Sequence, residues 1–249
     1  MVTYKQFWQK AERVGSVGLR SLLGTFLMQN CAVCRRATAQ SFCLDCYRRI
    51  EVECFTAKQK SKSFEQLIVD NGLAIGALGQ YQGTLKQAIL ALKYENCPEV
   101  ARLLGAALAK NWQSQIDQWQ NKRSQSLYVV PIPLHANRLA QRGYNQAALI
   151  ARSFCQTSGL GLAEQALLRR EDTKPQYQLG AKARQENLAS AFEISTAWRR
   201  KQAARGKISI LLIDDIYTTG ATARSAATVL RSSGCSVVGV LALASAKSS

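Results

Sequence analysis

An apolar run that ends in two adjacent carboxylates is the feature that most restricts the fold of this chain. The segment 210–222 reads ILLIDDIYTTGAT, in which Asp214 and Asp215 precede a loop of threonine and glycine. Residues 208–213 have the apolar, β-branched character of a buried strand, and residues 221–232 have the pattern of a helix. Strand, loop and helix in this order predict an α/β sheet whose ligands bind beyond the carboxyl ends of its strands.

The loop in this segment is suited to a phosphate group. Residues 218–222 supply backbone N–H groups, threonine hydroxyls and a glycine that lets the main chain approach closely. The helix that follows directs its positive end to the same place. Asp214 and Asp215 would accept hydrogen bonds from the vicinal hydroxyls of a ribose, so the segment favours a sugar phosphate. The alternative is that the two aspartates only cap the loop at the end of the strand.

From Gly72 onward the chain alternates strand-like and helix-like patterns. We expect strands over 73–81, 127–132, 208–213 and 237–243, and helices over 85–94, 98–119, 139–154 and 221–232. Residues 169–184 are polar and irregular. Continuous β-branched and leucine runs between helices indicate a parallel sheet that is covered on both faces. The expected fold class is therefore α/β, with a Rossmann-like parallel sheet flanked by helices.

Four of the eight cysteines follow the spacing C-x2-C-x8-C-x2-C, namely Cys31, Cys34, Cys43 and Cys46. Each pair brings two thiolates onto one ion, and two pairs complete a tetrahedral site of the kind that holds structural zinc. An iron–sulfur centre or a redox dithiol pair is the alternative. The polar stretch KQKSKS at 58–63 indicates a boundary. We expect a basic N-terminal helix and four-cysteine zinc module at 1–60, and the α/β domain at 61–249.

The chain is strongly basic, with 33 lysines and arginines against 16 aspartates and glutamates, a formal net charge of +17. This excess favours anionic partners such as phosphorylated small molecules or nucleic acid, although a solvated basic surface is the alternative. Four arginines lie near the cysteines: Arg35, Arg36, Arg48 and Arg49. No apolar run reaches the length of about 18 residues that a membrane span needs. We therefore expect no transmembrane segment and a cytoplasmic location.

Several segments resemble known families. Residues 210–222 resemble the phosphoribosyl-pyrophosphate (PRPP) signature of type I phosphoribosyltransferases. Residues 130–146, VPIPLHANRLAQRGYNQ, resemble the characteristic block of the ComF family of competence proteins, and residues 173–187 and Lys93–Tyr94 are also similar to that family. Together with the four cysteines, the resemblance covers nearly the whole chain from about Cys31 onward. It implies a type I phosphoribosyltransferase-like domain preceded by a zinc module.

The resemblance also implies roles for individual residues. Asp214 and Asp215 would be the catalytic pair. The PRPP-binding residues would be Tyr217, Thr218, Thr219, Gly220, Ala221 and Thr222. The pyrophosphate would lie near Leu134, His135, Arg138, Arg142, Lys174 and Arg184, the last two from a loop that closes over PRPP in active transferases. For His135, a surface or core position is an equal alternative, and Asn145 and Gln146 line the following helix or cap it.

The function implied is that of a ComF-type protein that binds PRPP or ribose 5-phosphate and acts in natural transformation, where incoming single-stranded DNA and a DNA helicase are the partners. Zinc would be structural, and Mg²⁺ would bind with PRPP. The chemistry would be displacement of pyrophosphate at the anomeric carbon, a pentosyltransferase reaction. A housekeeping phosphoribosyltransferase with an unidentified acceptor and a non-catalytic PRPP sensor are the alternatives, and neither the acceptor nor the oligomeric state can be read from the sequence.

Overall fold

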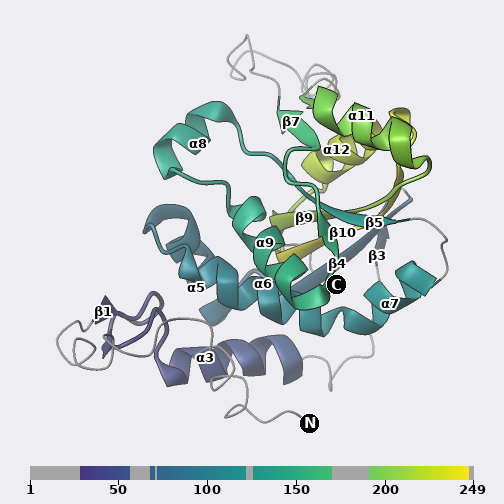
Figure 1. Cartoon of the computed structure of the whole chain (residues 1–249). Coiled ribbons are helices and arrows are strands. Elements are labelled where there is room, and N and C mark those ends of the chain that lie inside the picture. Colours follow the sequence, from purple (N-terminus) through teal and green to yellow (C-terminus); the bar gives the residue numbers. More distant parts are fainter. Residues whose placement is uncertain (1–28, 57–67, 71, 122–125, 170–190, 247–249) are drawn as a thin grey trace, which may run out of the picture.

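A six-stranded sheet forms the centre of the computed structural model, which describes residues 29–56, 68–70, 72–121, 126–169 and 191–246 (Figure 1). In spatial order its strands are β3 (Ile68–Asp70), β4 (Leu73–Gln80), β10 (Ser236–Ser245), β9 (Ser209–Tyr217), β5 (Leu127–Pro131) and β6 (Gly161–Leu162). The β3–β4 pair is antiparallel, whereas β4, β10, β9, β5 and β6 are parallel to their neighbours. The expected α/β fold with a parallel sheet is confirmed.

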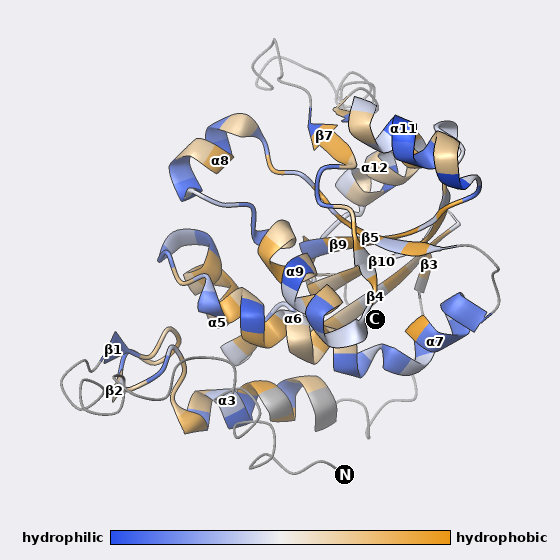
Figure 2. Ribbon diagram, in the orientation of Figure 1, coloured by the Kyte–Doolittle hydropathy of each residue, from blue (hydrophilic) through white to orange (hydrophobic). Residues whose placement is uncertain are grey.

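Helices cover both faces of this sheet, as the continuous apolar strands require. One face carries α5 (Gly83–Tyr94), α6 (Glu99–Asn111) and α9 (Gln146–Ser158), and the other carries α11 (Thr196–Arg205) and α12 (Ala221–Ser232). Successive residues of β9 alternate between the two cores: Leu211 and Ile213 join the first, and Ile210 and Leu212 join the second. Figure 2 shows the apolar character of the central strands beside the polar surface of α11.

Two helices expected from the sequence are each divided in the structure. The expected helix at 98–119 is α6 followed by α7 (Gln113–Asn121), because Trp112 leaves the helical conformation. The buried ring of Trp112 packs against Gly76 of β4. The expected helix at 139–154 is α8 (Ala136–Arg142) followed by α9, because Gly143 has a φ of 75° and ends α8 in the left-handed region.

The four-cysteine segment packs directly on the α/β domain. It consists of the short pair β1 (Gln29–Asn30) and β2 (Ala37–Thr38), helix α3 (Leu44–Glu51) and a π-helical turn, η1 (Val52–Thr56). Side chains of this segment, including Ile50 and Cys54, lie in the same core as Leu85 of α5. The boundary expected near residue 60 falls outside the described residues.

A further two-stranded sheet joins β7 (Leu167–Arg169) to β8 (Phe192–Ile194), next to α11 and α12. The expected irregular segment at 169–184 lies almost wholly outside the described residues. Among the helices that the structure describes, none is both long enough and apolar enough to cross a membrane.

Candidate functional site

The carboxyl ends of β5 and β9 lie side by side and bring two of the expected segments together. Pro131 pairs with Ile213, and the backbone N–H of Ile132 donates to the carbonyl of Ile213 over 2.9 Å. β9 continues as far as Tyr217, because β10 pairs with it up to Ser245. The expectation that the strand ends at residue 213 is wrong, and both aspartates lie within the strand. Since β5 ends earlier, they flank the turn that follows it.

Asp215 faces helix α5. Its Oδ2 lies 3.0 Å from Nζ of Lys93, in the last turn of α5, and both side chains are only 15% exposed. A charge pair this well shielded from water is held more firmly than one on the surface. Lys93 therefore belongs to the site, although the sequence offered only its similarity to the ComF family.

Asp214 has a different environment. Burial raises the pKa of Asp214 to about 8, and the negative charge of Asp215 acts in the same direction. The backbone N–H of Asp215, which donates to Oδ1 of Asp214 over 2.8 Å, and the positive charges of Lys93 and Arg169 lower the pKa in part. Near neutral pH Asp214 is therefore largely protonated, and in that form it is a hydrogen-bond donor as well as an acceptor.

The loop after β9 is shaped by Gly220, which has a φ of 78° and begins α12. A Cβ at this position would collide with the ring of Tyr217, which is 2% exposed and lies beneath the loop. Tyr217, which is expected among the PRPP-binding residues, is thus buried against the loop that the other expected residues form. Thr218 and Thr219 are exposed, and Ala221 and Thr222 are half-buried. Arg224 holds the loop by donating to the carbonyl of Thr219 over 2.9 Å.

The turn after β5 is held by two helix caps. His135 caps α8, since its Nδ1 accepts a hydrogen bond from the N–H of Asn137 over 3.2 Å. Asn145 caps α9 by accepting from the N–H of Ala147 over 3.0 Å, and its amide donates to the carbonyl of Ile132 over 3.1 Å. The helix-cap alternative for Asn145 is therefore confirmed, and this side chain ties α9 to the turn.

The remaining expected anion-binding residues are placed as follows. Leu134 is half-buried in the turn, and Arg138 is exposed on α8. Arg142 stacks over the ring of Tyr94 at 5.0 Å and donates to Oε1 of Gln146 over 3.1 Å, so it links α8 to the end of α5 and the start of α9. Lys174 and Arg184 lie outside the described residues.

The four cysteines of the module converge. Their sulfur atoms all lie within 4.8 Å of one another, and Cys31 and Cys46 are buried. Sulfur atoms 2.3 Å from one tetrahedral zinc ion are about 3.8 Å apart. The separation of 3.6 Å between the Sγ atoms of Cys34 and Cys43 is close to this value. The donor set therefore fits a tetrahedral metal ion.

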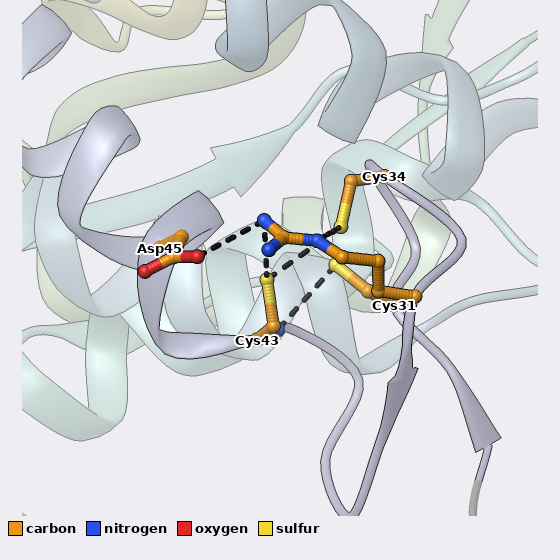
Figure 3. A network of polar contacts seen from close by, with 5 residues as sticks. Cys31, Cys34, Cys43 and Asp45 are labelled. Atoms are coloured by element: carbon orange, nitrogen blue, oxygen red, sulfur yellow. Dashed lines mark hydrogen bonds and ion pairs between the residues drawn. The ribbon is translucent and has the colours of Figure 1, made fainter.

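Hydrogen bonds to the sulfur atoms favour their thiolate forms (Figure 3). Nε of Arg36 donates to Sγ of Cys34 over 3.3 Å, and this contact is the main reason that the pKa of Cys34 falls to about 6. The backbone N–H of Cys43 donates to Sγ of Cys31 over 3.4 Å. Burial raises the pKa of Cys46. Arg36 also pairs with Asp45 of α3 at 3.0 Å, so this arginine links the cysteine cluster to α3.

Several bacterial proteins are similar in sequence to this chain. It is 28% identical over 222 residues to the DNA utilization protein YhgH of Salmonella typhimurium, covering 86% of this chain and 88% of that protein. It is 26% identical to competence protein F of Haemophilus influenzae over 78% of each chain, and 37% identical to competence protein ComFC of Bacillus subtilis over 43% of this chain and 39% of that one. No family model matches. The resemblance to ComF-type competence proteins is confirmed.

Two solved structures give partial matches to this chain. One is the glutamine PRPP amidotransferase of B. subtilis, with a TM-score of 0.38 and 14% identity over 61% of this chain and 30% of that one. The other is the adenine phosphoribosyltransferase of Leishmania tarentolae, with a TM-score of 0.31 and 17% identity over 54% of this chain and 56% of that one.

Proposed function

We propose that this ComF-type protein binds a ribose phosphate, PRPP or ribose 5-phosphate, at the carboxyl edge of β5 and β9. The observation that carries the proposal is the position of Asp214 and Asp215 near the carboxyl end of β9, shortly before a glycine-containing loop that leads into α12. Backbone N–H groups at the start of a helix favour phosphate, and adjacent carboxyls favour vicinal hydroxyls. A ribose phosphate carries both a phosphate and vicinal hydroxyls.

Each part of the ligand then has its own partners. The 5′-phosphate would contact residues 218–222, and the ribose hydroxyls would contact Asp214 and Asp215. A pyrophosphate would lie at the turn of Leu134 and His135, toward the positive charges of Arg138 and Arg142. Bound Mg²⁺ would neutralise charge on the pyrophosphate and take most of its oxygen ligands from the substrate. The chain's own contribution to a pentosyl transfer would be orientation and electrostatic stabilisation.

The cellular role that we propose is in natural transformation, with single-stranded DNA as a partner. Its support is the naming of relatives as competence proteins and DNA utilization proteins, together with the net charge of +17. For the four-cysteine cluster we propose structural zinc, because a closed set of four thiolates leaves no coordination position for a substrate. Elemental analysis of protein purified under reducing conditions is expected to give about one zinc per chain, and iron in its place would contradict this assignment.

Calorimetric titration with PRPP and Mg²⁺ tests the ligand. Replacing both aspartates, Asp214→Asn and Asp215→Asn, removes the carboxyl acceptors and is expected to weaken binding by about 1–3 kcal/mol per lost hydrogen bond. The matched control is Asp117→Asn on α7, which removes a carboxylate whose hydrogen-bond partner is Gln113 of the same helix. Equal affinities in the wild type and the double variant would refute the site. Release of pyrophosphate on addition of an acceptor would distinguish a transferase from a sensor.

A further inference from the structure

The first turn of helix α5 is capped by the four-cysteine module, which consists of β1, β2, α3 and η1. Glu53 lies in η1, directly after α3, and its two carboxylate oxygens accept the backbone N–H groups of Thr84 and Leu85, each over 3.0 Å. These donors lack partners within the helix, so Glu53 acts as a cap supplied from another element. Gly83 makes room for it, because a Cβ there would lie 2.9 Å from Oε1 of Glu53.

The other end of α5 meets the module again. Arg35, the residue after the metal-ligand candidate Cys34, forms an ion pair with Glu95, which ends the helix. Between the two ends, Cys31 and Ile50 of the module share a core with Leu85 and Leu92 of α5. The module therefore contacts this helix at its start, along its buried side and at its end.

The last turn of α5 also reaches the ribose-phosphate site. Lys93 contacts Asp215 at 3.0 Å, and the carbonyl of its neighbour Leu92 accepts a hydrogen bond from the hydroxyl of Tyr144 over 2.7 Å. Tyr144 lies between α8 and α9, beside the turn after β5. A displacement of α5 would thus move both Lys93 and its link to that turn.

We propose that the four-cysteine module is a positioning element of the Asp214–Asp215 site, because Glu53 and Arg35 hold α5 and α5 places Lys93 against Asp215. This inference rests on the proposed function for its ligand. A metal ion that fixes Cys31, Cys34, Cys43 and Cys46 fixes the start of α3 and the backbone of Arg35. Loss of the ion then releases Lys93 from the aspartates without any contact between the metal and the ligand.

The charges around the aspartates set the pH at which the two carboxyls ionise. This pH would not change if the four-cysteine module only stabilised the fold. Asp214 is influenced by the negative charge of Asp215 and the positive charges of Lys93 on α5 and Arg169 on β7. Lys93 favours the ionised pair, so withdrawing it raises the pH at which the ionised pair forms. Ribose 5-phosphate affinity measured across pH reports this midpoint.

The experiment compares the zinc-loaded full chain with Glu53→Ala, Arg35→Gln, Lys93→Met and Lys93→Arg. Hydrogen exchange at residues 83–95 is expected to accelerate about threefold to tenfold in Glu53→Ala, as for the loss of a helix cap. The binding midpoint is expected to move to higher pH in Lys93→Met, to move less in Glu53→Ala, and to be largely restored in Lys93→Arg. Arg35→Gln removes a surface ion pair and is expected to give the smallest change.

Removal of zinc by a chelator is expected to reproduce both effects of Glu53→Ala, whereas Asp117→Ala on α7 is expected to produce neither. Unchanged exchange at residues 83–95 and an unchanged midpoint, in both the chelated protein and Glu53→Ala, would overturn the proposal. If neither PRPP nor ribose 5-phosphate binds the wild type, the proposed function fails, and exchange at residues 83–95 still decides whether the module holds α5.

Discussion

Two adjacent aspartates in one strand have different environments, because neighbouring side chains project to opposite faces of a sheet. Asp215 meets Lys93, which lies on α5, whereas burial raises the pKa of Asp214 to about 8. The sequence DD predicted two equivalent acceptors for ribose hydroxyls. The structure separates them into a carboxylate with a cationic partner and a carboxyl that is largely protonated at neutral pH.

This difference predicts how stability depends on pH. Folding raises the pKa of Asp214, so as pH rises the carboxyl loses its proton in the unfolded state before it does so in the folded state. The free energy of unfolding therefore decreases as pH rises from about 4 to about 8. Asp214→Asn removes this decrease. We expect its free energy of unfolding to exceed that of the wild type by about 1–3 kcal/mol at pH 8 and by much less at pH 4.5.

Urea denaturation at several pH values measures this difference. Asp117→Asn, at an exposed position on α7, is the control and is expected to show no comparable trend. A variant Asp214→Asn that is less stable than the wild type at every pH would mean that its carboxyl is held by contacts that favour the charge. Greater stability together with lost ligand binding would show that the site is maintained at the expense of stability.

At the scale of single elements, strands were easier to predict than helix limits. The apolar runs at 127–132 and 237–243 correspond to β5 and β10, since burial on both faces leaves a continuous signal. The divisions at Trp112 and Gly143 were not predicted. Trp112 ends α6 through packing on Gly76 of another element, which no local pattern reports. Gly143 and the capping residue Asn145 can be read in the sequence, but a glycine within a helical pattern does not by itself end a helix.

Gly220 carries a prediction about the loop between β9 and α12. Gly220→Ala is expected to destabilise the protein by about 2–4 kcal/mol, because a side chain there has an unfavourable φ and also displaces Tyr217. The matched control is Gly159→Ala at the end of α9, where φ is 75° and nothing lies within 4 Å of the added Cβ. That variant is expected to lose only about 1 kcal/mol.

Thermal or urea denaturation of the two variants gives the comparison, and ribose 5-phosphate affinity is measured beside it. Only Gly220→Ala is expected to lose affinity, because it moves the N–H groups at the start of α12. Equal destabilisation of the two variants would show that the ring of Tyr217 moves away from the added Cβ without loss of stability, which its burial beneath the loop argues against.

At the scale of the whole molecule, the parallel sheet and the convergence of the four cysteines followed from sequence pattern, whereas the contact between them did not. By resemblance, the motifs at 130–146 and 210–222 were expected to contact one ligand, and the pairing of β5 with β9 brings them side by side. Lys93 reaches the site through one ion pair with Asp215, whereas Glu53 and Arg35 contact the two ends of α5. No spacing rule predicts such long-range contacts. Among the described residues, side chains from the expected modules at 1–60 and 61–249 pack in one common core.

The charge of the whole chain gives a prediction about nucleic acid. The structure changes which arginines are suitable for the test, because Arg35 pairs with Glu95 and Arg36 contacts two cysteine sulfurs. Arg48 and Arg49 are exposed on α3 and can be replaced without disturbing those contacts. If the module binds single-stranded DNA, Arg48→Gln with Arg49→Gln should lower affinity and reduce the slope of log K against log salt by about 1.4, or about 0.7 per phosphate contact.

The matched control removes the same charge from the opposite side of the molecule, Arg199→Gln with Arg200→Gln on the exposed surface of α11 (Figure 1). We expect the α3 variant to reduce DNA affinity and transformation frequency, the α11 variant to have little effect, and PRPP binding to persist in both. Equal losses in the two variants would mean that DNA responds to net charge and not to the module. If neither variant changes DNA binding or transformation, the proposed handling of single-stranded DNA by this module is wrong. The sugar-phosphate site is tested independently, through Asp214 and Asp215.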